Sequence, residues 1–187
     1  MIENKITMVL YNHMSVSNCK INYIKDIDLN KIKPSRSGAI IYTVYKNRLY
    51  FILGEDTPTG EITDFAGGVS FKKENFLDGG LRELTEESLG IFGEISADEI
   101  KNFLAVYDEN TIILFIRLDI DIIAKHKEFK ERVKCVINPE VKDLKILDKQ
   151  NFIALCRGDK ICNTVMYDRV RTLLSTAKDQ HQFLKYL

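Results

Sequence analysis

Short apolar runs rich in β-branched and aromatic residues predict the strands in the middle of the chain. Residues 39–45 and 49–53 form two such runs, and the polar residues 46–48 between them predict a hairpin. A second pair of strands is predicted over 103–107 and 111–118. The last of these runs is apolar nearly throughout, as expected of a strand that is covered on both faces.

A different period marks residues 75–89, where Leu77, Leu81 and Leu84 recur at the spacing of one helix face. The chain then continues with a predicted strand over 141–147 and predicted helices over 149–156 and 163 to about 184. This alternation predicts an α/β fold in which a mixed β-sheet lies between two helical layers, an α/β/α sandwich.

The length of 187 residues suffices for one substantial hydrophobic core, so we expect a single domain over 1–187. Residues 1–33 mix short apolar and polar pieces and are expected to form an N-terminal extension or an added strand. Basic and acidic residues balance at 27 each, so no overall field draws the chain to nucleic acid or to an anionic membrane.

The sequence also bears on the compartment. No stretch approaches the roughly 18 apolar residues that span a bilayer, and the N-terminus lacks the apolar core of a secretory signal. The 4 cysteines include no C-x-x-C pair, which argues against a structural zinc and a redox dithiol. We therefore expect a cytoplasmic protein with reduced thiols and no membrane partner.

The candidate chemistry lies in residues 67–91. On a helix that turns about 100° per residue, Glu83, Glu86 and Glu87 fall within roughly 100° of one another and away from the leucines. Carboxylate oxygens are the ligands that Mg²⁺ prefers. An acidic cluster on an amphipathic helix is more often only a solvated face, so the spacing alone leaves both interpretations open.

The same segment resembles the Nudix box, G-x5-E-x7-R-E-U-x-E-E-x-G-U, in which U is a bulky aliphatic residue. The matching positions follow one another without a gap: Gly68, Glu74, Arg82, Glu83, Leu84, Glu86 and Glu87. The departure is Leu89, which stands where the box has glycine, with Gly90 one residue late. Together with that extra residue, the phrase EITDFAGGVS over 61–70 is similar to Nudix proteins of some large DNA viruses.

The resemblance implies a Nudix-type sandwich that binds Mg²⁺ or Mn²⁺ through catalytic glutamates. The implied metal ligands are the carboxylates of Glu83, Glu86 and Glu87 and the backbone carbonyl of Gly67. It also implies a structural ion pair between Glu74 and Arg82, which holds the loop before the helix to the helix itself.

The general base in this family is either a box glutamate, here Glu83, or an acid from a later loop. Glu128 and Glu131 are the downstream candidates for a base or a metal ligand. An exposed, charged helix explains these two residues equally well.

The implied function is a metal-dependent hydrolase that cleaves the diphosphate bond of a nucleoside diphosphate linked to another moiety, by attack of water on phosphorus. The expected partner is a nucleotide-type small molecule, and a homodimer stays open. One alternative is a decapping hydrolase that acts on capped RNA, which requires a salt-sensitive basic path. The other is a catalytically silent Nudix-fold binding or regulatory module, against which the intact Glu83, Glu86 and Glu87 argue.

Overall fold

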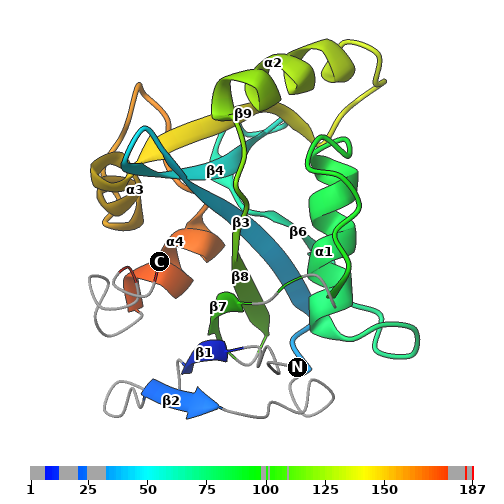
Figure 1. The fold of residues 1–187 in the computed structure, drawn as a ribbon, viewed down its shortest axis with the longest axis vertical. Coiled ribbons are helices and arrows are strands. Elements are labelled where there is room, and N and C mark those ends of the chain that lie inside the picture. The colour runs from blue at the N-terminus through cyan, green and yellow to red at the C-terminus, as the bar shows by residue number, and fades with distance from the viewer. Residues whose placement is uncertain are drawn as a thin grey trace, which may run out of the picture.

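The computed structural model describes residues 7–12, 21–24, 33–97, 100, 102–108, 110–176, 184 and 187. Within these ranges the strands are β1 (Thr7–Asn12), β2 (Ile21–Ile24), β3 (Arg36–Tyr45), β4 (Arg48–Asp56), β5 (Ile62–Thr63), β6 (Phe65–Gly68), β7 (Asn102–Tyr107), β8 (Thr111–Arg117) and β9 (Val141–Asp148). The helices are α1 (Phe76–Glu87), α2 (Ile122–Val133), α3 (Lys149–Cys156) and α4 (Asp168–Thr176). Figure 1 shows their arrangement.

The first predicted hairpin is confirmed, with longer strands and a tighter turn than expected. β3 and β4 pair antiparallel, and Tyr45 stands opposite Arg48. The turn consists of Lys46 and Asn47 alone, with φ angles of 50° and 62°. Two successive left-handed residues give a turn whose twist matches that of the flanking strands, which is why so short a connection suffices here.

The described strands form one mixed sheet. Its order is β2-β1-β7-β8-β3-β4-β5, with β6 paired to β3 and β9 paired to β4. β3 runs parallel to β8 and antiparallel to β4 and β6, so both pairing modes meet at the central strand. The predicted pair over 103–107 and 111–118 is confirmed as β7 and β8. At the far edge β1 lies parallel to β7, and β2 pairs antiparallel with β1.

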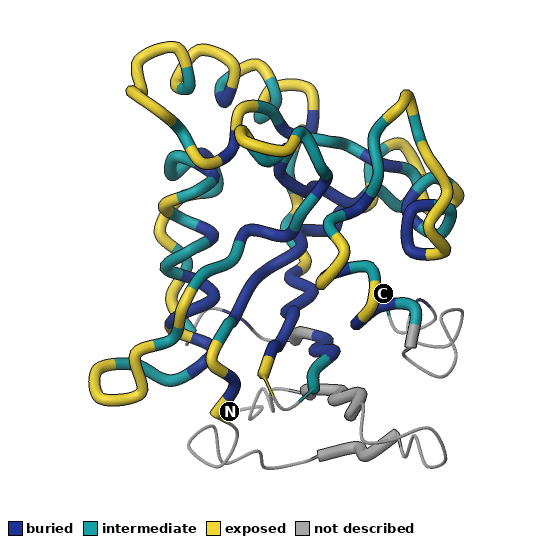
Figure 2. Tube along the Cα trace, turned by 180° about the vertical axis from the view of Figure 1, so that it is seen from behind, coloured by how far each residue is buried: buried dark blue, intermediate teal, exposed yellow. Residues whose placement is uncertain are grey.

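Helices cover both faces of this sheet (Figure 1). One core cluster joins the leucines of α1 and the apolar side of α2 to one face, and a second joins α3 and α4 to the other. The buried trace in Figure 2 runs along the central strands between these layers. The predicted α/β/α sandwich with a mixed sheet is therefore confirmed, and so are the strand at 141–147 and the helix at 149–156.

The predicted helix from 163 to about 184 is wrong at its start. α4 begins only at Asp168, because Cys162 and Asn163 adopt left-handed φ angles of 50° and 64° in a tight turn. Met166 then bridges to Ile62, which extends the sheet beside β5. The region 177–183 lies outside the described residues. Within the described ranges, every helix is too short or too polar to pass through a bilayer.

Candidate active site

α1 packs one apolar side against the core and turns its acidic side toward β6 and the loop before the helix. The side chain of Asn75 caps the helix by accepting two backbone N–H groups of its first turn. Leu77, Leu81 and Leu84 are all buried, so the predicted stripe is confirmed. The helix predicted over 75–89 begins at Phe76 and ends at Glu87. The acidic residues of the box thereby occupy its last turns.

Arg82 is the centre of a network on the acidic side. Its guanidinium donates to both carboxylate oxygens of Glu74, at 3.1 and 3.0 Å, and to the carbonyl of Gly68 at 3.0 Å. The same group donates to Glu83 at 2.6 Å and to Glu86 at 3.1 Å. Its hydrogen bonds hold the pKa of Glu74 below the ordinary value. Arg82 thus ties the loop before α1 to two of the three glutamates.

The third glutamate, Glu87, points toward β6. Its Oε2 accepts the backbone N–H of Ala66 in β6 at 2.9 Å. The pKa of Glu87 is raised to about 9, chiefly because burial disfavours its ionised form. Three further carboxylates add to that rise by repulsion: those of Asp64, Glu140 and Glu83. Negative charge is therefore concentrated around the end of α1.

Asp64 occupies the bend between β5 and β6 and is fully buried. Arg36 of β3 donates to both of its carboxylate oxygens, at 3.0 and 2.6 Å, and the arginine is only 12% exposed. Gly38 makes room for this pair, since a Cβ there would collide with Ala66 and with the Asp64 carboxylate. The pair also lies near Glu87, since the charges of Glu87 and of the pair act on one another.

Glu83 lies against the backbone of Gly67. A Cβ on Gly67 would collide with all three terminal atoms of the Glu83 carboxylate group, whereas a Cβ on Gly68 would meet nothing within 4 Å. The close approach of carboxylate to backbone explains why glycine is needed at the first position and not at the second.

Given the hydrolase activity that the resemblance implies, Gly67→Ala is expected to push Glu83 out of place and to lower kcat at least about ten-fold, because the implied metal ligands must be held to a fraction of an ångström. Gly68→Ala, one residue away, serves as the matched control and should change kcat no more than about two-fold. Steady-state kinetics of both variants checks this. Equal losses in the two variants would contradict the assigned contact.

The two downstream candidates, Glu128 and Glu131, lie on α2 in ion pairs. Glu128 accepts from Lys125 at 3.0 Å and from Arg132 at 2.6 Å. The Lys125 hydrogen bond, above all, holds the pKa of Glu128 below its ordinary value. Glu131 pairs with Lys134 at 3.0 Å, and both are well exposed. Neither glutamate is among the groups that perturb Glu87.

Two acids near Glu87 did not emerge from the sequence: Asp64 and Glu140. Glu140 directly precedes β9, and its carbonyl accepts the backbone N–H of Thr57 from the turn after β4. The available signals were weak, namely an acid inside the strand-like stretch ITDF and an acid between a proline and the predicted strand at 141–147. Only the sheet pairing brings these residues to the end of α1.

The turn at the C-terminus of α1 shows how the chain accommodates leucine at position 89, where the box has glycine. Gly90 N–H donates to the carbonyl of Thr85 at 2.8 Å and Leu89 N–H to that of Glu86 at 3.1 Å, the two bonds of a Schellman motif. Leu89 itself takes the left-handed φ of +57° that glycine usually supplies. The extra residue therefore does not lengthen the helix; instead a leucine adopts a conformation that costs roughly 1 kcal/mol.

No protein-family model and no curated protein matches the chain. Among solved structures, it is similar to a C. elegans Ap4A hydrolase binary complex, with 15% identity, 81% of this chain and 99% of that chain covered, and a TM-score of 0.47. It is also similar to the NUDIX domain of Shewanella oneidensis NrtR complexed with ADP ribose, with 13% identity, 83% of this chain and 94% of that chain covered, and a TM-score of 0.45. A third similar structure is a NUDIX hydrolase from Nitrosomonas europaea, with 17% identity, 80% of this chain and 74% of that chain covered, and a TM-score of 0.36. These TM-scores stay below 0.5, so the case for function rests on this chain's own residues.

The chemistry of the cluster around Glu87 fits a divalent cation. Its side chains offer hard carboxylate oxygens, and a cation would relieve the repulsion that adds to the effect of burial on the pKa of Glu87. Within the described residues, no three His, Cys, Asp or Glu side chains stand together in a metal-binding arrangement. Arg82 is bound to oxygens of both Glu83 and Glu86. A metal ion at these glutamates would therefore compete with Arg82 for them.

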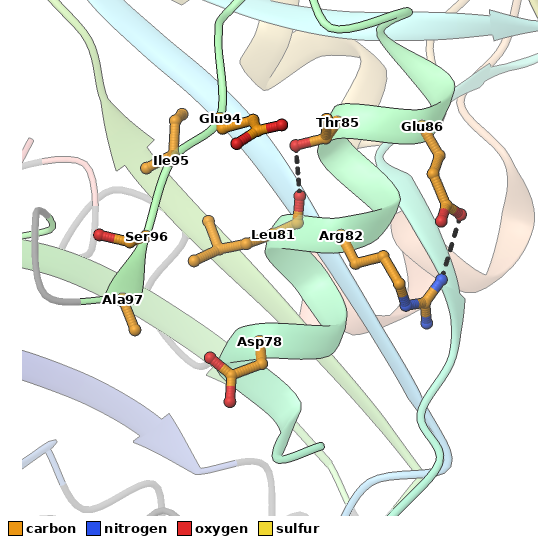
Figure 3. Close-up of a pocket in the computed structure, with 9 residues that line it drawn as sticks. All are labelled: Asp78, Leu81, Arg82, Thr85, Glu86, Glu94, Ile95, Ser96 and Ala97. Carbon is orange, nitrogen blue, oxygen red and sulfur yellow. Dashed lines mark hydrogen bonds and ion pairs between the residues drawn. The ribbon is translucent and has the colours of Figure 1, made fainter. Parts of the chain in front are cut away.

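An open hollow of about 370 Å³ lies along α1. Its lining comes from α1 and from the segment after it: Asp78, Leu81, Arg82, Thr85, Glu86, Glu94, Ile95, Ser96 and Ala97. Figure 3 shows the segment 94–97 beside one flank of the helix, with Arg82 and Glu86 on the other. Glu83 and Glu87 are not among the lining residues, so the hollow meets the acidic side of the helix only at Arg82 and Glu86.

Proposed function

We propose that this chain is a Nudix hydrolase, a metal-dependent enzyme that cleaves the diphosphate bond of a nucleoside diphosphate linked to another moiety. The observation that carries the proposal is the placement of the box residues. They match the pattern in continuous register, and the helix they form brings Glu83 against Gly67 and holds a half-buried Glu87 among other carboxylates. A merely solvated acidic face has no reason to place a half-buried carboxylate against the Ala66 N–H and near other acids.

In this proposal Glu83, Glu86 and Glu87 hold Mg²⁺ or Mn²⁺, with the carbonyl of Gly67 as a further oxygen. The bound metal would neutralise charge on the diphosphate and lower the pKa of the attacking water. Arg82 keeps Glu83 and Glu86 close to the loop, and Glu74 holds Arg82 by both carboxylate oxygens. The Arg36–Asp64 pair supports β6, whose Ala66 N–H orients Glu87.

Glu140 is the acid that we propose to accept the proton of the attacking water, in place of Glu128 or Glu131. Its charge acts on Glu87, whereas Glu128 is engaged by two cations of its own helix. A carboxylate near the proposed metal ligands can take up a proton on an oxygen atom, which is what a general base requires. Glu140→Gln should lower kcat about a hundred-fold with little change in KM, and an unchanged kcat would argue for another base.

A panel of diphosphate substrates tests the function. It should contain a nucleotide sugar, a dinucleoside polyphosphate, a modified nucleoside triphosphate and capped RNA, each assayed with Mg²⁺, with Mn²⁺ and with EDTA. We expect metal-dependent cleavage of at least one nucleotide, and in H₂¹⁸O the label should enter a phosphate of the product. Cleavage of capped RNA alone would favour the decapping alternative. Metal binding without turnover of any substrate would favour the silent module.

A further inference from the structure

The turn that follows α1 is held from outside by α2. Arg132 donates through Nη1 to the carbonyl of Leu89 at 2.6 Å, and Lys125 donates through Nζ to the carbonyl of Ile91. Figure 1 shows α2 crossing near this end of α1. Both acceptors are carbonyls of the turn that contains the left-handed Leu89. Two cations separated by two helical turns of α2 therefore fix the two ends of one short segment.

Glu128 joins the two cations to each other. It accepts from Lys125 through one carboxylate oxygen at 3.0 Å and from Arg132 through the other at 2.6 Å. A carboxylate between a lysine and an arginine three and four residues away restricts the rotamers of both. Lys125, Glu128 and Arg132 thus act as one unit, which we call the α2 clamp.

We propose that the α2 clamp is a positioning device for the last turn of α1, and that it fixes the backbone from which Glu86 and Glu87 reach a metal ion. These two glutamates are the last residues of the helix, where helices fray most easily. The turn beyond them contains a leucine in a conformation that favours glycine. Without outside support the turn would relax, and the motion would pass directly to the adjacent ligands.

The clamp residues are poorly suited to a purely structural role. Arg132 is 46% exposed and Glu128 is 34% exposed, so their ion pair contributes little to the free energy of unfolding. Their contact with the turn is local, and a displacement of about 1 Å at a reacting group can cost a hundred-fold in rate. The expected signature is a large effect on metal use and a small effect on global stability. The link to metal use rests on the proposed function, whereas the hold on the turn does not.

Arg132→Ala tests the clamp in the full-length protein. We expect about ten-fold faster hydrogen exchange at the amides of Leu89 and Gly90, about ten-fold weaker Mn²⁺ binding by calorimetric titration, and an unchanged thermal midpoint. With a substrate, half-saturation by Mg²⁺ should rise about ten-fold while KM for the nucleotide stays constant. Arg132→Lys, which keeps one donor, should recover part of each loss. Lys134→Ala is the matched control, because Lys134 pairs with Glu131 on the same helix.

Leu89→Gly tests whether the clamp acts through the left-handed turn. Glycine adopts this φ without strain, so Arg132→Ala should have a smaller effect in the Leu89→Gly background than in the wild type. The comparison of the two backgrounds cancels whatever packing the leucine side chain itself contributes. A coupling of at least about three-fold in Mn²⁺ affinity is expected. Equal effects of Arg132→Ala in both backgrounds would show that the turn does not carry the effect.

The outcomes separate this proposal from the proposed function. Unchanged hydrogen exchange and Mn²⁺ affinity in Arg132→Ala would overturn the clamp while an active wild type kept the enzyme assignment intact. A wild type that binds no metal and cleaves no diphosphate would overturn the enzyme assignment. In that case faster exchange at Leu89 and Gly90 alone would reduce the clamp to a stabiliser of the turn, which contradicts the positioning role.

Discussion

Glu87→Gln is expected to abolish hydrolysis and, in the absence of metal, to make the folded protein more stable than the wild type above neutral pH. The carboxylate is a proposed metal ligand, so kcat should fall roughly a thousand-fold. It is also a half-buried acid whose pKa is raised to about 9 from 4.5. A neutral amide of the same shape removes the cost of ionising that group.

The pH dependence of stability follows from the direction of this shift. Between pH 4.5 and about 9 the folded chain retains a proton on Glu87 that the unfolded chain has released. The contribution of this retained proton to the stability of the folded state is fully present below pH 4.5 and is lost as the pH rises through about 9. Urea denaturation in EDTA should therefore show the wild type weakening over this range, with Glu87→Gln ahead by about 2 kcal/mol near pH 9.

Glu86→Gln provides the comparison, because Glu86 is 60% exposed and pairs with Arg82 at the surface. It should lose activity to a similar extent with a change in stability below about 0.5 kcal/mol. Full activity of Glu86→Gln would contradict the proposed metal site. A Glu87→Gln variant that is less stable than the wild type at pH 9 would instead show that the carboxylate is well satisfied in its ionised form.

The features that the sequence predicts well are those set by neighbours along the chain. The leucine stripe of α1 and the runs that became β3, β4, β7 and β8 depend on periodicity within a few residues, and the structure contains each of them. The register of the glutamates on α1 likewise follows from helical geometry. The spacing of residues along the chain was therefore sufficient to predict the layers of the fold and the acidic face of α1.

The remaining parts of the site depend on pairings between distant strands. Arg36 meets Asp64 because β3 pairs with β6 and the chain bends between β5 and β6. Glu140 reaches the same region because β9 pairs with β4. No periodicity encodes such contacts. Leu89 is a related case. A leucine in a left-handed turn needs support from other groups, and here Arg132 and Lys125 bind the carbonyls of that turn.

The partial burial of the Glu87 carboxyl group lowers the stability of the fold, whereas the charges of the nearby Arg36–Asp64 pair are matched. Glu87 is kept as a half-buried acid, while the neighbouring Arg36–Asp64 pair is matched in charge and in hydrogen bonds. A fully paired ion pair can be buried at modest net cost, but the loss of one partner leaves the other charge unsatisfied. The stability of β6, and with it the orientation of Glu87, should therefore depend strongly on Asp64.

Asp64→Ala is accordingly expected to lower the free energy of unfolding by about 3 to 5 kcal/mol, because Arg36 is left buried without its partner. Urea denaturation at neutral pH in EDTA measures this without a contribution from metal. Asp119→Ala is the matched control: it breaks the Arg117–Asp119 pair, whose partners are 53% and 83% exposed, and should cost less than about 0.5 kcal/mol. The double variant Arg36→Met with Asp64→Leu should regain much of the stability, since it removes both charges. If the double variant is no more stable than Asp64→Ala, the loss arises from packing around the bend and not from the unpaired arginine.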